Sequence, residues 1–128
     1  MSSRVLVVDP HAHIVDLLRK VLELAGYEVE TASSTASAIA QMERHEFSVA
    51  LVNLRLPDGD GLRLLRLLKS RDPSLEVILM TGSCPSNATV AEATDQGAFH
   101  FLFKPFDLDE MLTVVANAEC RRKRADSE

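Results

Sequence analysis

Residues 49–61 read VALVNLRLPDGDG, and this stretch decides the fold. The apolar run 49–52 has the length and the β-branched content of a strand that is buried on both faces, and Asn53 ends it. The segment that follows, 54–61, contains proline and two glycines, which is typical of a turn. Asn53 is therefore expected at the carboxyl end of a strand, the edge of open α/β sheets at which ligands bind.

Asparagine at this edge restricts the chemistry of the site. An aspartate there could coordinate a cation or attack a phosphoryl group, whereas the side-chain amide of Asn53 has no anionic oxygen. The fold can therefore be predicted, while the chemistry that such an edge usually hosts is expected to be switched off.

Strand and helix patterns alternate on both sides of this stretch. Short apolar or alternating runs predict further strands at 5–8, 27–31, 76–80 and 99–102. Apolar residues at three- and four-residue spacing predict helices at 14–25, 34–45, 62–68, 86–96 and 108–115. Because parallel strands need crossover connections, the alternation predicts a single α/β domain with helices on both faces of a parallel sheet.

Composition excludes several classes of protein. The 128 residues, 46% of them hydrophobic and 26% charged, suit one globular domain. A net charge of −5 gives no general reason to bind nucleic acid or an acidic membrane surface, and no apolar stretch approaches the roughly 18 residues of a membrane span. The predicted first strand leaves no room for a signal peptide, and Cys84 and Cys120 lack CxxC spacing. We expect a cytoplasmic protein with two free thiols.

Four residues follow or end predicted strands and should meet at one edge of the sheet: Asp9, Asn53, Thr81 and Lys104. The segments that contain them are VLVVD (5–9), NLRLPDGDG (53–61), MTG (80–82) and GAFHFLFKPF (97–106). In this order they resemble the receiver domains of bacterial two-component response regulators, over nearly the whole chain. The resemblance implies a flavodoxin-like, doubly wound, five-stranded parallel sheet of order 2-1-3-4-5 with five helices.

The resemblance also implies roles for single residues. Asn53 stands at the position of the aspartate that accepts a phosphoryl group from a histidine kinase. Thr81 matches the hydroxyl residue that contacts the phosphoryl group, and Lys104 matches the lysine that pairs with it. Phe101 matches the aromatic switch residue, and the bond before Pro105 matches a cis peptide of the family.

The acidic pocket departs from the family pattern. Besides Asn53, Pro10 stands where a second acid is expected after Asp9, and His11 occupies a position that is often acidic. Magnesium prefers anionic oxygen ligands, so Asp9, Asn53 and the backbone of Arg55 should bind it weakly or not at all. We therefore expect no cofactor.

Simpler structural roles also fit these residues. Lys104 is expected to pair with Asp9 across the pocket, and Thr81 would then only shape the turn after its strand. Phe101 is equally explained as a core or interface aromatic. His11 and His13 lack the spacing of metal ligands on a helix and are interpreted as surface residues at a helix start.

The resemblance and these departures from it predict an atypical receiver that is not an enzyme. The resemblance also implies that it binds a protein partner or a second copy through its fourth helix, fifth strand and fifth helix (about Ala88 to Cys120). Residues 121–128, RRKRADSE, lose the apolar periodicity. We therefore expect a domain at 1–120 and a charged tail that leads toward an effector domain after Glu128. The basic residues of the tail are interpreted as helix-end cations, without contact to nucleic acid.

Two alternative functions stay open at this point. The chain could be an ordinary receiver that carries an engineered Asp→Asn change at position 53, which the codon in the native gene would reveal. It could also be a small-ligand-binding protein on a flavodoxin-like scaffold, which an absorbance spectrum would test for a bound flavin.

Overall fold

A computed structural model describes residues 3–82 and 84–127 of the chain. Its main sheet has five parallel strands in the order β2-β1-β3-β6-β7. This is the predicted order 2-1-3-4-5, because β4 and β5 form a separate antiparallel pair. The strands of the main sheet are β1 (Arg4–Val8), β2 (Glu28–Ala32), β3 (Val49–Asn53), β6 (Glu76–Thr81) and β7 (His100–Phe103).

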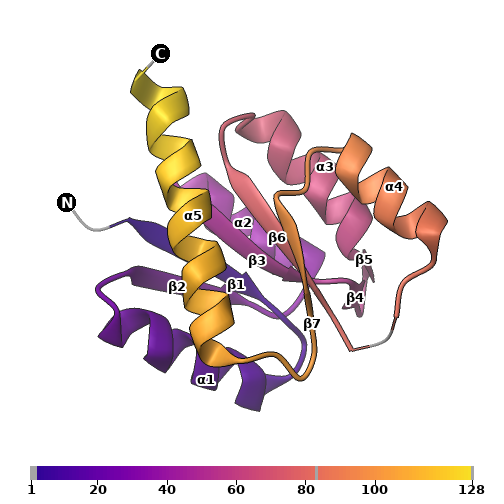
Figure 1. Ribbon diagram of the computed structural model, residues 1–128, viewed down its shortest axis with the longest axis horizontal. Coiled ribbons are helices and arrows are strands. Elements are labelled where there is room, and N and C mark those ends of the chain that lie inside the picture. Colours follow the sequence, from indigo (N-terminus) through magenta and orange to yellow (C-terminus); the bar gives the residue numbers. More distant parts are fainter. Residues whose placement is uncertain (1–2, 83, 128) are drawn as a thin grey trace.

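Helices cover both faces of this sheet, as Figure 1 shows. The apolar side chains of α1 and α5 pack with alternate residues of the central strands, such as Val7 and Leu51. Those of α2, α3 and α4 pack with the other alternate set, such as Leu6 and Val52. This division confirms the doubly wound fold. The helices are α1 (Ala12–Leu24), α2 (Thr35–Arg44), α3 (Gly61–Arg71), α4 (Asn87–Asp95) and α5 (Leu108–Ser127).

The burial of the strands follows their sequence patterns. Every residue of β3 and β6 is buried, whereas β2, which alternates polar and apolar residues, lies at an edge of the sheet. Each fully buried valine or leucine contributes roughly 1.5–3 kcal/mol relative to exposure, so the central strands supply much of the stability. The helix α4 is thinly packed, as its alanine-rich sequence predicted, and Ala93 is its buried residue.

The turn after Asn53 has more structure than the sequence predicted. It contains the short strands β4 (Arg55–Leu56) and β5 (Gly59–Asp60). Asp60 caps α3 as expected, since its carboxylate accepts a hydrogen bond from the backbone N–H of Arg63 at 2.8 Å. The carboxylate of Asp58 accepts hydrogen bonds from the backbone N–H groups of Thr35 (2.8 Å) and Ala36 (3.0 Å) in the first turn of α2. The β4–β5 pair therefore joins α3 to α2.

The end of the chain differs from the prediction. The helix α5 does not stop near residue 120 but continues through Ser127, and Arg122 is buried. The expectation that a charged tail at 121–128 follows the last helix is therefore wrong for residues 121–127, and Glu128 lies outside the described residues. Loss of apolar periodicity did not end the helix, because a buried arginine can occupy an inward position when its charge is paired. Within the described part of the chain, no helix combines the length and the apolar content needed to cross a membrane.

Candidate functional site

The four predicted strand-end residues lie together at the carboxyl edge of the sheet. Asp9 follows β1, Asn53 ends β3, Thr81 ends β6 and Lys104 follows β7. The last two strands are held in register there, because the backbone N–H of Lys104 donates to the carbonyl oxygen of Thr81 at 2.7 Å. Asp9, Asn53 and Thr81 are buried, whereas Lys104 keeps 19% of its side chain exposed.

Lys104 contacts both Asp9, which follows β1, and Asn53, which ends β3. Its ammonium group lies 2.6 Å from Oδ2 of Asp9 and donates to Oδ1 of Asn53 at 3.0 Å. The predicted ion pair between Lys104 and Asp9 is thus confirmed. Because the Asp9 side chain is fully buried, its negative charge needs this partner, and a charge-assisted hydrogen bond supplies it.

The second oxygen of the Asp9 carboxylate is also occupied. Oδ1 accepts the backbone N–H of His11 at 2.9 Å and lies 2.8 Å from the ring Nδ1 of the same residue. The ring donates here when its proton is on Nδ1. His11 is exposed at the start of α1, as expected for a surface histidine. The sequence did not reveal its contact with Asp9, although a histidine two residues after an aspartate is within reach of such a bond.

Each polar atom of the Asn53 side chain has a hydrogen-bond partner. Nδ2 donates to the carbonyl oxygen of Arg55 at 2.7 Å, and Oδ1 accepts from Lys104. A carboxylate could not make the first of these bonds, because it has no hydrogen to donate. Gly61 lies against the backbone of Asn53: a Cβ atom on Gly61 would stand 2.7 Å from the Asn53 carbonyl oxygen. The start of α3 can approach the end of β3 this closely only because residue 61 has no side chain.

The oxygen atoms at this edge do not fit a magnesium ion. Both oxygens of Asp9 are bonded to Lys104 and His11, and the Arg55 carbonyl accepts the Asn53 amide. Pro10 adds no ligand atom in its side chain. Within residues 3–82 and 84–127, no three His, Cys, Asp or Glu side chains are grouped so that they could hold a metal. Magnesium needs several anionic or carbonyl oxygens in octahedral geometry, and this edge offers one carboxylate that already has a cation.

A cleft of about 590 Å³ opens over these residues. Pro10, His11, Thr81, Lys104 and the segment 53–57 form its walls, together with Gly82. The fold therefore still provides a recess at the carboxyl edge. Two of its lining side chains, those of Lys104 and Asn53, are hydrogen-bonded to each other.

The aromatic residue implied as a switch lies on β7, three residues before Lys104. Phe101 is half-buried against the core between the sheet and helices α2 to α4. Its ring stacks on that of Phe103, with centroids 6.3 Å apart and planes inclined by 17°. Phe103 is 51% exposed. The peptide bond between Lys104 and Pro105 is cis, as the resemblance implied.

Comparisons with known proteins agree with this geometry. Residues 5–116 match the family described as the response regulator receiver domain. The chain is 39% identical over 112 residues to the DNA-binding transcriptional regulator NtrC of Escherichia coli K12, which covers 88% of this chain and 24% of that protein. It thus spans about a quarter of the length of the curated relatives it matches.

Solved structures give the same result. A CheY-like receiver domain from Methanospirillum hungatei JF-1 superimposes with a TM-score of 0.93 at 28% identity, covering 98% of this chain and 99% of that one. The beryllofluoride-activated NtrC4 receiver domain dimer gives a TM-score of 0.86 at 34% identity, covering 93% and 98%. With its sheet order, its strand-end residues and these matches, the chain belongs to the response regulator receiver domain family.

Proposed function

We propose that this chain is an atypical receiver domain, which acts in two-component signal transduction by binding proteins and does not accept a phosphoryl group by the usual aspartyl route. The observation that carries the proposal is the pair of hydrogen bonds made by the Asn53 side chain. In this proposal the domain performs no catalysis of its own and needs no metal.

The chemistry of an amide supports this proposal. Phosphoryl transfer to a side chain needs a nucleophilic oxygen, and an ionised carboxylate provides one. The amide oxygen of Asn53 is neutral and accepts a hydrogen bond from Lys104, while its nitrogen donates to Arg55. Both polar atoms are thus already hydrogen-bonded, and the residue is 6% exposed where it lines the cleft.

Charge at the pocket supports the same conclusion. Phosphoryl transfer depends on cations that neutralise the developing charge of the phosphoryl oxygens, a role for which magnesium is the usual ion. Asp9 is bonded to Lys104 on one oxygen and to His11 on the other. Pro10 cannot supply a carboxylate beside it. Two separate losses, at positions 10 and 53, therefore weaken both the acceptor and the metal site.

Treatment with acetyl phosphate and Mg²⁺ tests the proposal. Intact-mass spectrometry of the wild-type chain should detect no phosphoryl adduct, and beryllofluoride should leave the amide NMR spectrum around residues 53–57 unchanged. The matched control is the double variant Pro10→Asp/Asn53→Asp, which restores both carboxylates and should form an adduct. Asn53→Asp alone should respond less than the double variant, because Pro10 still limits magnesium binding. A stoichiometric adduct on the wild-type pocket would contradict the proposal.

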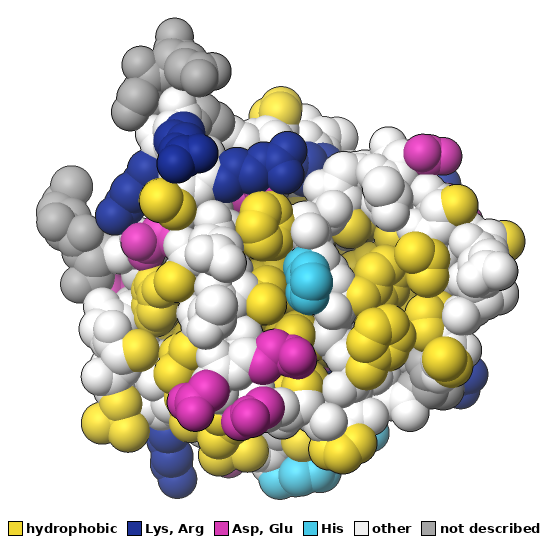
Figure 2. Space-filling view, in the orientation of Figure 1, with side chains coloured by type: hydrophobic (Ala, Val, Ile, Leu, Met, Phe, Trp, Pro, Cys, Tyr) yellow, Lys and Arg dark blue, Asp and Glu magenta, His cyan; other side chains and the backbone are white. Residues whose placement is uncertain are grey.

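The proposed output of the domain is binding through the α4–β7–α5 face, from about Ala88 to Cys120. Figure 2 views this face, where hydrophobic side chains gather between α5 and α4. Phe103 and Val90 are exposed large apolar residues within it, at 51% and 36%. The solved NtrC4 receiver domain is a dimer, which supports a second copy of this chain as one occupant of the face.

An effector domain after Glu128 completes the proposal. The relatives include full-length DNA-binding transcriptional regulators, of which this chain matches about a quarter. In such a protein the receiver would control a separate DNA-binding region. The net charge of −5 gives the receiver itself no general attraction to nucleic acid.

A further inference from the structure

Arg122 lies where the inward-facing stripe of α5 continues beyond its apolar residues. Met111, Val115 and Ala118 are fully buried against the sheet at spacings of four and three residues. The next position in this series is 122, and the side chain of Arg122 is only 6% exposed. Cys120, two residues before it, is exposed. Apolar docking of the helix therefore ends at Ala118, and an arginine takes the following core position.

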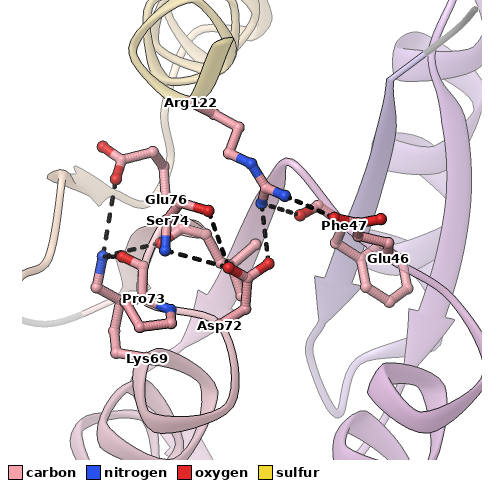
Figure 3. A network of polar contacts seen from close by, with 9 residues as sticks. Glu46, Phe47, Lys69, Asp72, Pro73, Ser74, Glu76 and Arg122 are labelled. Carbon is pink, nitrogen blue, oxygen red and sulfur yellow. Dashed lines mark hydrogen bonds and ion pairs between the residues drawn. The ribbon is translucent and has the colours of Figure 1, made fainter. Parts of the chain in front are cut away.

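The guanidinium group of Arg122 binds residues of two loops, Glu46 and Phe47 in one and Asp72 in the other (Figure 3). Nη1 donates to the carbonyl oxygen of Phe47 at 2.7 Å and to Oδ2 of Asp72 at 3.0 Å. Nη2 donates to Oε1 of Glu46 at 2.9 Å. Glu46 and Phe47 precede β3, whereas Asp72 precedes β6. One side chain thus links α5 to the amino ends of the two central strands.

Two of these acceptors, on Asp72 and Phe47, are also held by contacts of their own, whereas the Glu46 side chain is 82% exposed. Asp72 is the C-terminal cap of α3, and its Oδ1 accepts hydrogen bonds from the backbone N–H (3.1 Å) and the hydroxyl (2.9 Å) of Ser74. Its other oxygen, Oδ2, faces Arg122. The Phe47 side chain is buried in the core, which fixes the position of its carbonyl group. A guanidinium group gains most from such fixed partners, because its planar donors lose little further freedom.

Arg121 makes a second, weaker attachment on the neighbouring side. Its Nε lies 3.3 Å from Oε2 of Glu76, the first residue of β6, and its guanidinium carbon lies 5.7 Å from the centre of the Phe99 ring. The Arg121 side chain is 69% exposed, so solvent screens this contact. Arg122 is therefore the principal attachment.

We propose that Arg122 clamps the C-terminal turns of α5 to the amino edge of the sheet, so that residues 119–127 form a rigid helical arm of fixed direction. Figure 1 shows α5 crossing the sheet and continuing beyond it. A short helical segment composed mostly of charged residues frays in water, because helix formation alone is marginal at this length. The contacts of Arg122 supply the stabilisation that the sequence of this segment does not provide by itself. A partner of this arm meets it in one orientation, whether or not Asn53 accepts phosphate.

Hydrogen exchange of the backbone amides in the 128-residue chain tests the clamp. In Arg122→Gln, amides of residues 119–124 should exchange about tenfold faster or more, while those of β3 and of residues 111–115 keep their protection. The matched control is Arg124→Gln, which makes the same substitution at an exposed position of the same helix. Unchanged exchange at 119–124 in Arg122→Gln, or equal acceleration in the control, would overturn the proposal.

A double-mutant cycle separates the clamp from a general weakening of α5. Asp72→Asn leaves the sequence of α5 intact and keeps an oxygen for Ser74, but it removes the charge that faces Arg122. This variant should also accelerate exchange at residues 119–124, and combining it with Arg122→Gln should add little further. Should Arg122→Gln fail to fold, Asp72→Asn alone decides. Normal protection of residues 119–124 in Asp72→Asn, or strictly additive effects in the cycle, would contradict the inference.

Discussion

Lys104 balances the charge at the carboxyl edge of the sheet. The carboxylate of Asp9 is fully buried, and the ammonium group of Lys104 is 2.6 Å from it. The backbone N–H of His11 donates to the same carboxylate and its ring Nδ1 lies 2.8 Å away, but the His11 side chain is 57% exposed. Lys104 thus serves Asp9 as a built-in cation, and Asn53 orients it with its amide oxygen.

Replacing Lys104 should destabilise the fold, because the buried charge of Asp9 would lose its cationic partner. Lys104→Met keeps the length of the side chain but removes its charge, and we expect the free energy of unfolding to fall by about 2–4 kcal/mol. Urea denaturation measures this loss. Adding Asp9→Asn to Lys104→Met should recover most of it, because the buried charge disappears. The exposed Lys20→Met is the control and should be nearly neutral. A nearly neutral Lys104→Met would mean that Asp9 is stabilised without the lysine.

At the scale of elements, the β4–β5 pair connects the site to α2. Asp58 sits in this turn, and its carboxylate binds two backbone N–H groups at the start of α2. These bonds to Thr35 and Ala36 hold the pKa of Asp58 below its ordinary value. A carboxylate at a helix N-terminus is also favoured by the helix dipole. The turn that follows Asn53 therefore fixes the position of a second helix.

Asp58 should make stability depend on pH in the acid range. Its folded pKa is lowered, so its contribution is present above the unfolded pKa and is lost as the pH falls through the folded value. Asp58→Asn should lower the Tm near neutral pH, and the difference from wild type should shrink as the pH falls through the lowered pKa of Asp58. Thermal unfolding across pH measures both. Asp16→Asn, at an exposed pair with Arg19, is the control, and a wild-type Tm in Asp58→Asn at neutral pH would contradict the expectation.

If the α4–β7–α5 face forms a dimer interface, a substitution in it should weaken self-association. Phe103 is its most exposed large apolar residue, so Phe103→Ser removes apolar contact area without opening a cavity in the core. We expect Phe103→Ser to weaken any dimer of the chain by about tenfold or more in sedimentation experiments. The control is Leu24→Ser, which changes an 89% exposed leucine on α1, outside this face. If both variants weaken association equally, the interface lies elsewhere.

At the scale of the whole molecule, the sheet separates two polar networks. Asn53 and Lys104 lie at its carboxyl edge, and Arg122 lies at its amino edge, with β3 and β6 running between them. Both networks consist of charged or amide groups that bind one another around a buried charged residue, Asp9 or Arg122, although Glu46 and His11 are exposed. The domain is thereby held at both ends by contacts that need no added ligand.

Magnesium should therefore leave the stability of the whole chain unchanged. A ligand that binds only the folded state raises its stability by RT ln(1 + [L]/Kd), so weak binding gives no shift. The Tm of the wild-type chain should be the same with EDTA and with millimolar Mg²⁺. The Pro10→Asp/Asn53→Asp variant should gain stability with Mg²⁺ because it restores two carboxylates. A clear Mg²⁺-dependent rise in the wild-type Tm would contradict the account of the pocket given above.

The alternation of helices and strands could be predicted because it depends on local periodicity. The runs at 5–8, 49–52 and 77–80 are apolar throughout, and they lie in the buried central strands β1, β3 and β6. Their order in the sheet came from the family resemblance and is confirmed by the strand pairing. The gathering of Asp9, Asn53, Thr81 and Lys104 at one edge then followed, since the ends of parallel strands meet there.

By itself, the sequence determined which residues reach the carboxyl edge and that residue 53 brings an amide to it. Only the tertiary structure decided what each polar group binds: Asn53 the Arg55 carbonyl, Asp58 the start of α2, and Arg122 the loops before β3 and β6. The reason is physical. Periodicity encodes which side of an element avoids water, whereas the partner of a buried charge can lie 75 residues away, as for Arg122 and Phe47, and is set only when the elements pack.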